Sequence, residues 1–226
     1  MTAKHRFLTQ AGIDFAEEMT ASAMHELKNK LAIINENSGL IQDFSIKARQ
    51  GGRALDIDRI EAISIKIQQQ IQTSDKIIKK VNRFYQEMGT RTKDVNIEQI
   101  LTFVVRLADR LLDKRGCQIH INAPKSPVIA QFNPFHLQLV LWKILDSISR
   151  SAGTNCQVNV SLTSSAERAS IIFKVDRGSM THLDTISETD EIKNLTRFLG
   201  VQVRLLEEPN TISVMIGQHN KKNRKY

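Results

Sequence analysis

The sequence is poor in cysteine and in aromatic residues. Only two of its 226 residues are cysteines, Cys117 and Cys156, and neither belongs to a CxxC motif or a cysteine–histidine cluster. This argues against a zinc site, an iron–sulfur site and a disulfide scaffold, so we expect no metal and two half-buried, reduced thiols. Aromatic residues make up 5% of the chain and form no pattern typical of an RNA-binding sheet.

Long hydrophobic runs are absent as well. No apolar segment approaches the roughly 18 residues that a membrane-spanning helix needs. Residues 1–12 include basic side chains but no apolar core, so we expect no signal peptide. Hydrophobic residues at 41% and charged residues at 25% are typical of a folded globular chain. The sequence therefore predicts a cytoplasmic globular protein with no membrane partner.

The chain carries an excess of positive charge. Its 32 lysines and arginines against 24 acidic residues give a net charge of +8. Such a charge favours acidic partners. The only dense basic run lies in the tail, residues 218–226, and no nucleic-acid-binding motif accompanies it. We therefore do not expect nucleic acid as the partner.

Residues 1–90 are predicted to form a hairpin of two long helices. The first should begin near Gly12–Asp14 and end at Gln50–Gly52, and the second should run from Asp56–Asp58 to Gly89. Each carries an apolar stripe at helical spacing: Met24, Leu27, Leu31, Ile34, Ser38 and Ile41 on the first, and Ile60, Ile63, Ile67, Ile71, Ser74, Ile78, Val81, Tyr85 and Met88 on the second. Such a hairpin leaves an apolar face uncovered. We predict a homodimer with a four-helix bundle, the alternative being a monomer whose hairpin packs on the second half.

Residues 94–217 are predicted to form an α/β sandwich, which makes the fold class α+β. Asn96 and Asn133 are expected to cap two helices that end at Gly116 and near Gly153. A third helix, capped by Ser187, should end at Leu199–Gly200. Alternating patterns predict strands at Gln118–Asn122, Val128–Gln131, Val158–Leu162, Ile171–Val175, Val201–Leu205 and Ile212–Ile216.

The segment Met24–Asn29 of the first helix contains the residues best suited to chemistry. His25 lies one position past the apolar stripe, so its imidazole should reach solvent, and Asn29 shares that face. Glu26 could accept the proton of one ring nitrogen, which leaves the other as a nucleophile for a phosphoryl group. Asn29 could hydrogen-bond a phosphoryl oxygen or an attacking water. By spacing alone, an ordinary surface histidine remains an open alternative.

His25–Asn29 (HELKN), followed by Leu31–Ile34 (LAII), resembles the H-box of the sensor histidine kinases. The order of the second half, including Asn133–Phe135 before a long helix, resembles the ATP-binding domain of that family. The resemblance implies a dimerisation and phosphoacceptor domain followed by an ATPase-like domain. In the family, the residues matching Glu26 and Asn29 are associated with phosphotransfer and with hydrolysis of the partner's phosphoryl group.

The second half departs from the family where nucleotide should bind. Lys143 and Ser147 stand at the positions of two asparagines that hold magnesium and phosphates, and serine is a poor substitute for an amide oxygen as a magnesium ligand. Asp176 and Gly178 match the Asp and first Gly of the DxGxG box, but Met180 replaces its second Gly. The second glycine-rich box is missing, and with it the backbone cradle for a triphosphate. We expect a degenerate, inactive ATP site at Asp176 and Gly178, in a member of the family without a sensor domain.

The leading hypothesis is a histidine phosphotransferase without a cofactor of its own. Phospho-His25 would exchange its phosphoryl group with the aspartate of a response regulator, whose receiver domain supplies Mg²⁺. The expected docking surface is Lys30, Ile33, Asn37 and Leu40 on the first helix, where Lys30 replaces the proline usual in the family. Ile33 and Leu40 would otherwise widen the core.

Three alternatives remain open. Glu26 and Asn29 could position water, which would make the protein a response regulator phosphatase. The chain could be a non-catalytic scaffold that binds a receiver domain. It could also be an active kinase with a divergent ATP site. The five other histidines (His5, His120, His136, His182 and His219) are expected to be structural or surface residues, and Trp142 is expected in the core or an interface.

Overall fold

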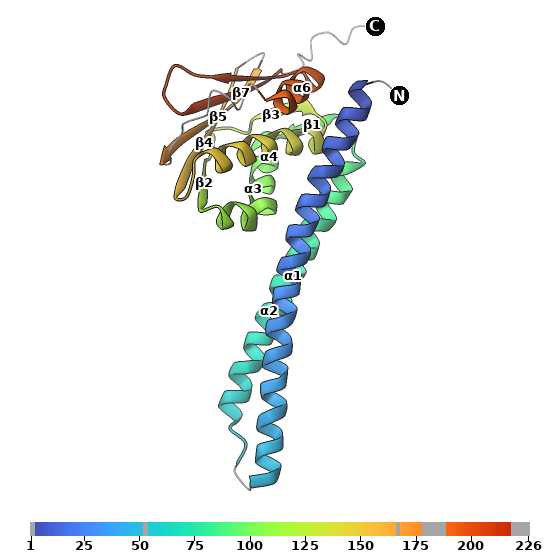
Figure 1. Ribbon diagram of the computed structural model, residues 1–226, viewed down its shortest axis with the longest axis vertical. Coiled ribbons are helices and arrows are strands. Elements are labelled where there is room, and N and C mark those ends of the chain that lie inside the picture. The colour runs from blue at the N-terminus through green and yellow to red at the C-terminus, as the bar shows by residue number, and fades with distance from the viewer. Residues whose placement is uncertain (1–2, 52–53, 166–167, 178–188, 218–226) are drawn as a thin grey trace. The chain divides into compact units, whose positions relative to one another are not determined.

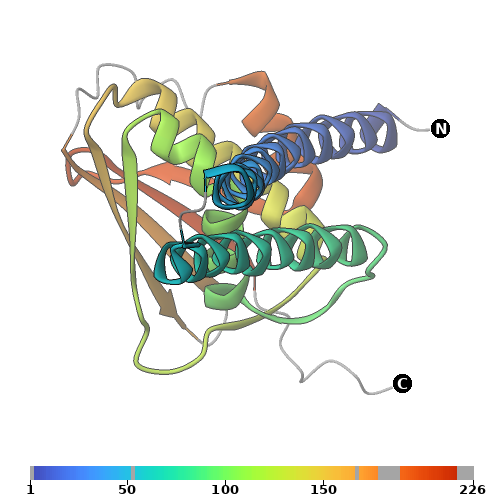
Figure 2. The ribbon, with the colours of Figure 1, turned by 90° about the horizontal axis from the view of Figure 1, so that it is seen from below.

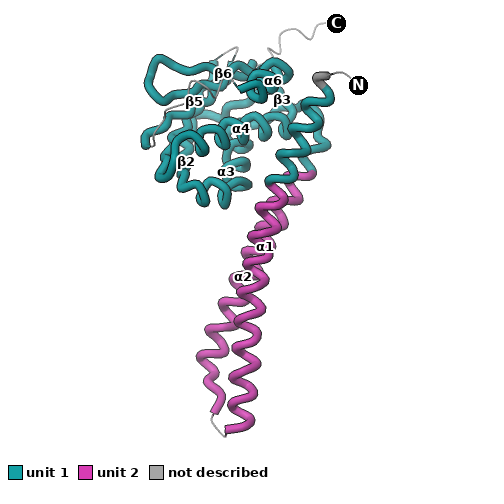
Figure 3. The backbone as a smooth tube through the Cα atoms, in the orientation of Figure 1, with its two compact units in different colours: residues 1–18, 86–226 teal, residues 19–85 magenta. Residues whose placement is uncertain are grey.

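The computed structural model describes residues 3–51, 54–165, 168–177 and 189–217. The chain divides into two compact units (Figure 3): a hairpin unit, residues 19–85, and a sandwich unit, residues 1–18 with 86–226. We expected the division near residue 90. It differs because the first turns of the first helix pack with the α/β part of the chain. Within the described residues, no helix is long and apolar enough to span a bilayer.

The hairpin consists of α1 (Ala3–Gly51) and α2 (Ile57–Met88), which run antiparallel (Figure 1). At the turn, the Asp56 side chain accepts a hydrogen bond from the backbone N–H of Arg59 at 3.0 Å, which caps α2. At the other end of the hairpin unit, the hydroxyls of Thr20 and Tyr85 lie 2.8 Å apart. The end of α1 and both ends of α2 agree with the prediction to within a residue or two.

The predicted start of α1 was wrong. The helix begins at Ala3, so that Gly12 lies inside it rather than at its first turn. A Cβ atom on Gly12 would lie only 3.1 Å from Cε1 of Phe135, so glycine serves close packing here and not helix termination. A glycine often marks the end of a helix, which is why Gly12 was predicted to lie at a boundary. Its contact with Phe135, distant in the sequence, shows instead that a small residue is needed for packing.

Close packing with the sandwich continues along the first turns of α1. Phe15 is fully buried, and its ring centroid lies 5.7 Å from that of Phe135. One turn later, a Glu18 carboxylate oxygen accepts a hydrogen bond from the indole N–H of Trp142 at 2.9 Å, and Trp142 is fully buried as expected. Arg115 lies 3.8 Å from the same Glu18 side chain. These contacts assign residues 1–18 to the sandwich unit.

The sandwich unit contains a mixed five-stranded sheet in the order β2-β4-β5-β7-β6, in which only β2 and β4 are parallel. Helices α3, α4 and α6 lie on one side of this sheet (Figures 1 and 2). The alternating burial along β4 and β5 agrees with a sheet covered on one face. The bounds are α3 (Ile97–Lys114), β2 (Cys117–Asn122), α4 (Pro134–Ser151), β4 (Cys156–Ser164), β5 (Arg168–Arg177), α6 (Asp190–Leu199), β6 (Val201–Leu205) and β7 (Thr211–Gly217).

This architecture confirms the predicted α+β class and each predicted strand. The expected caps of α3 and α4 form: Asn96 accepts from the N–H of Gln99 at 3.2 Å, and Asn133 from that of His136 at 3.0 Å. Two local predictions failed. The N-cap of α6 is Thr189, whereas Ser187 lies outside the described residues. A short strand, β1 (Lys93–Asn96), pairs with β3 (Ile129–Phe132) and was missed because Val95 is its one apolar residue, which gives no alternating pattern to detect.

Candidate functional site

The predicted phosphoacceptor lies in the middle of α1, in the hairpin unit. Ser22 and Ala23 of the preceding turn are buried, whereas His25 is exposed. Asn29, one turn further, is also exposed and lies on the same side of the helix. His25 makes no hydrogen bond and no ion pair with any described residue, so both of its ring nitrogens face solvent.

Glu26 is half-buried, and no hydrogen bond joins it to His25 among the described residues. The sequence interpretation gave Glu26 the proton of the His25 ring. Consecutive residues on a helix point about 100° apart and do not face each other, which explains why this contact is not formed.

Basic side chains gather at the level of His25. Because Thr20 contacts Tyr85 and the helices are antiparallel, five residues along α1 bring His25 level with residue 80 of α2. The lysines and arginine near this level form what we call the basic collar: Lys28, Lys76, Lys79, Lys80 and Arg83. Lys79 also pairs with Asp75 at 2.7 Å. The collar leaves an excess of positive charge around the imidazole, which suits an incoming phosphoryl group.

The hairpin has two apolar faces rather than the single stripe that was predicted. Ile63, Ile77 and Phe84 of α2 are buried against α1, although the predicted stripe contained neither Ile77 nor Phe84. A second set of residues from the predicted stripes stays exposed: Met24 (49%), Leu31 (60%), Ile71 (54%), Ile78 (47%) and Tyr85 (48%). The chain taken alone therefore leaves an apolar face along both helices uncovered.

The expected docking residues do not all reach the surface. Ile33 and Leu40 are 37% and 39% exposed, and Lys30 is half-buried. Asn37 is only 9% exposed, and its amide donates a hydrogen bond to the carbonyl of Ile33 at 2.7 Å. Asn37 was therefore wrongly placed on the docking surface: its side chain is buried and bonded to its own helix.

The position matching the nucleotide site is closed by protein contacts. The Lys143 ammonium forms an ion pair with Glu191 of α6 at 2.7 Å, and Ser147 is half-buried one turn further along α4. Asp176, at the end of β5, accepts a hydrogen bond from the amide of Asn159. Gly178 and Met180 lie outside the described residues. An ammonium group and a hydroxyl are a poor ligand set for Mg²⁺, so Lys143 and Ser147 do not fit the role of the two asparagines that the resemblance implies.

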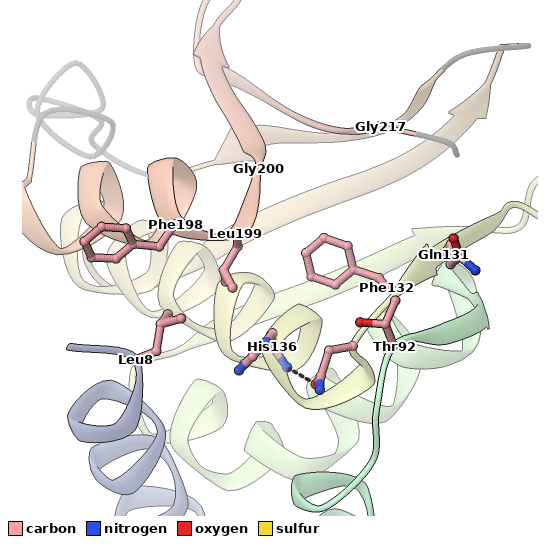
Figure 4. A pocket seen from close by; sticks show the side chains of 10 residues that line it. Leu8, Thr92, Gln131, Phe132, His136, Phe198, Leu199, Gly200 and Gly217 are labelled. Atoms are coloured by element: carbon pink, nitrogen blue, oxygen red, sulfur yellow. Dashed lines mark hydrogen bonds between the residues drawn. The ribbon is translucent and has the colours of Figure 1, made fainter. Parts of the chain in front are cut away.

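A pocket of about 360 Å³ lies elsewhere in the sandwich unit (Figure 4). It is lined by residues at the end of β3, the start of α4 and the end of α6, among them Phe132, His136 and Phe198. Lys143 and Ser147 follow His136 by about two and three helical turns. The pocket therefore does not coincide with the nucleotide position of the kinase family. Within the part of the chain that the structure describes, no group of three or more metal-ligating His, Cys, Asp or Glu side chains occurs.

No family model matches the sequence, and no curated protein does. Among solved structures, the chain is similar to the Acinetobacter baumannii histidine kinase AdeS, with 12% identity over 87% of this chain and 98% of that chain and a TM-score of 0.46. The ATP-binding domain of PrrB from Mycobacterium tuberculosis is 16% identical over 57% of this chain and 98% of its own length, at a TM-score of 0.47. The catalytic domain of histidine kinase ThkA is 8% identical over 58% of this chain and 97% of its own length, at a TM-score of 0.46.

Proposed function

We propose that the chain is a histidine phosphotransferase of two-component signalling that carries a phosphoryl group on His25. One observation carries the proposal: the imidazole of His25 is exposed and makes no hydrogen bond or ion pair with a described residue, and Asn29 lies one turn away on the same face. A nucleophile for phosphoryl transfer has to be reachable in line with the phosphorus–oxygen bond that breaks. A histidine on the outside of a helix meets that requirement.

In the forward reaction, a ring nitrogen of His25 attacks the phosphorus of an aspartyl phosphate on a receiver domain. The bond to the aspartate oxygen breaks, the carboxylate leaves, and the proton on the other ring nitrogen of the imidazole goes to water. The receiver's acidic pocket supplies Mg²⁺, so this chain needs no metal of its own. The reverse reaction passes the phosphoryl group to a second receiver.

The charge around His25 suits a receiver domain. Receiver active sites hold several carboxylates, and the basic collar presents lysines and an arginine at the level of the imidazole. Opposite charges increase the rate of encounter and do so less at high salt. Lys30, Ile33 and Leu40, below His25 on α1, would complete the contact surface, since two of them are exposed apolar side chains.

We further propose that two hairpins form a four-helix bundle in a homodimer. The support is the second apolar face, which includes Leu31 and Ile71 and which no described part of the hairpin unit covers. Two copies related by a twofold axis would bury this face against itself. The same surface exposed on a monomer would be costly in water.

The proposal does not include ATP. Two features of Lys143 support this exclusion. Lys143 stands where the kinase family has a magnesium-binding asparagine, and its ammonium group is paired with Glu191 of α6. A kinase with a divergent site would have to break this pair and still lack a ligand for the metal.

The test is to mix the full chain with a receiver domain that carries labelled phosphate. We expect acid-labile label on the wild-type chain and none on His25→Gln, which retains a polar side chain of similar size. Incubation with labelled ATP alone should leave the chain unlabelled. A wild-type chain that never takes up label would refute the phosphotransferase and leave the scaffold, whereas robust labelling from ATP would show a kinase.

Asn29 favours a second candidate function, a response regulator phosphatase. Its exposed amide lies one turn from His25, where it could position a water for attack on the aspartyl phosphate. For this function, Asn29→Ala should slow release of inorganic phosphate from the receiver by about 10²-fold while label still reaches His25. If both rates are unchanged, Asn29 has no role in hydrolysis. Asn35→Ala, which removes an exposed amide elsewhere on α1, is the matched control.

A further inference from the structure

The two cysteines of the chain lie side by side. In the parallel pair of β2 and β4, Cys117 is the direct partner of Cys156. Both side chains are buried, more deeply than the sequence suggested, and both are free thiols. Neighbouring strands are about 4.8 Å apart, which is within the range of about 4.4–6.8 Å between the Cα atoms of a disulfide.

The backbone in front of the two cysteines holds them in place. Gly116 has φ +67°, a conformation that favours glycine, and a Cβ atom there would lie 3.2 Å from the backbone nitrogen of Asn155. The residues that precede Cys117 and Cys156 are therefore in close contact. This contact lies before the two cysteines, and the pairing of β2 with β4 continues after them. Together they hold the two cysteines next to each other.

The two thiols are not equivalent. Cys156 lines a pocket of about 480 Å³ together with Gln118, Asn155 and Arg177, whereas Cys117 does not line it. A hydrogen bond between the thiols lowers the pKa of Cys156 and raises that of Cys117. A thiolate is the reactive form of cysteine, and a pocket of this size admits a molecule as small as a hydroperoxide. Cys156 is thus the cysteine that borders the pocket and the one that loses its proton more easily.

We propose that Cys117 and Cys156 form a reversible disulfide when a hydroperoxide enters this pocket. The Cys156 thiolate attacks the terminal hydroxyl oxygen of the peroxide, the oxygen–oxygen bond breaks, and hydroxide (or, from an organic hydroperoxide, alkoxide) leaves, which gives a sulfenic acid on Cys156. The Cys117 thiol then attacks that sulfur, a sulfur–sulfur bond forms, and water leaves. The two thiols are oxidised and the peroxide is reduced. This site is separate from His25 and does not rest on the proposed phosphotransfer.

The disulfide would fasten β2, the edge strand, to its only neighbour in the sheet. β2 follows α3 directly, so the crosslink would also fix the end of that helix relative to β4. Reduction by a small thiol would restore the open pair.

The test exposes the native wild-type chain to hydrogen peroxide, then alkylates it in denaturant and measures its mass. We expect the loss of both free thiols, a mass lower by two hydrogens, a Cys117–Cys156 crosslinked peptide, and full recovery with dithiothreitol. Two thiols that remain free after exposure of the folded chain would overturn the proposal. Crosslinking between chains in place of the internal bond would overturn it as well.

The order of the two steps is tested with single variants. Cys117→Ser should accumulate a sulfenic acid on Cys156 that dimedone labels, whereas Cys156→Ser should give no dimedone adduct. Labelling of Cys117 in Cys156→Ser at the rate seen for the other variant would contradict the assignment of Cys156 as the attacking sulfur. If a variant fails to fold by circular dichroism, the wild-type chain decides instead. Brief exposure with dimedone present should then trap the adduct on Cys156 alone.

Discussion

Replacement of Ile78 by aspartate is expected to convert the protein from a dimer to a monomer. Ile78 is 47% exposed in the single chain and lies on the uncovered apolar face of α2, whereas the neighbouring Ile77 packs against α1. A carboxylate at the dimer interface would lose its hydration without gaining a partner, at a cost of about 3–5 kcal/mol. That cost corresponds to a dissociation constant at least about 100-fold higher.

The measurement is molar mass by light scattering over a range of protein concentrations. Ile65→Asp is the matched control, because Ile65 is also 47% exposed on α2 but points about 140° around the helix from Ile78, away from the uncovered apolar face. The control should remain dimeric. A wild-type chain that is monomeric at micromolar concentration, or equal effects of the two substitutions, would contradict the proposed bundle.

Substitution of Phe15 by alanine is expected to destabilise the sandwich unit by about 3–5 kcal/mol. The ring of Phe15 is fully buried against Phe135, so its removal leaves a cavity that rigid neighbours cannot fill. Trp142 is the only tryptophan of the chain and lies in the same unit, so its fluorescence reports unfolding of this unit in urea. The midpoint should fall markedly without loss of the hairpin's helical signal.

Phe7→Ala provides the control for this substitution. Phe7 is half-buried and meets Phe198 edge to face at 5.6 Å between centroids, so it buries less surface. Its removal should cost about 1 kcal/mol. If Phe15→Ala behaves like Phe7→Ala, residues 1–18 do not belong to the folded core of the sandwich unit.

Local patterns in the sequence were sufficient for most helices and strands, apart from β1 and the start of α1, and for the exposure of His25. Helix caps such as Asn96 and Asn133 depend on residues three positions apart, and alternation along a strand depends on immediate neighbours. The exposure of His25 follows in the same way from its place beside a helical stripe. Such features depend on residues that are close together in the chain, so a single sequence is enough to predict them.

Contacts between distant segments could not be predicted. In α2, apolar residues occur in adjacent pairs, Ile77 with Ile78 and Phe84 with Tyr85. Either member of each pair fits an apolar stripe at helical spacing, and only the packing shows which member is buried against α1. Gly12 was interpreted as a helix start, since nothing local shows that a ring packs on it. The same limitation applies to pairing of the two cysteines, which depends on strand order in the sheet.

The most direct measurement of the central claim is to locate the phosphoryl group on the chain. After transfer from a phosphorylated receiver domain, the chain is digested at alkaline pH, where phosphohistidine survives, and its peptides are sequenced by mass spectrometry. The account predicts a phosphoryl group on the imidazole of His25 and on no other histidine. A phosphoryl group on His5, His120 or His136 in place of His25, or none anywhere in the chain, would contradict it.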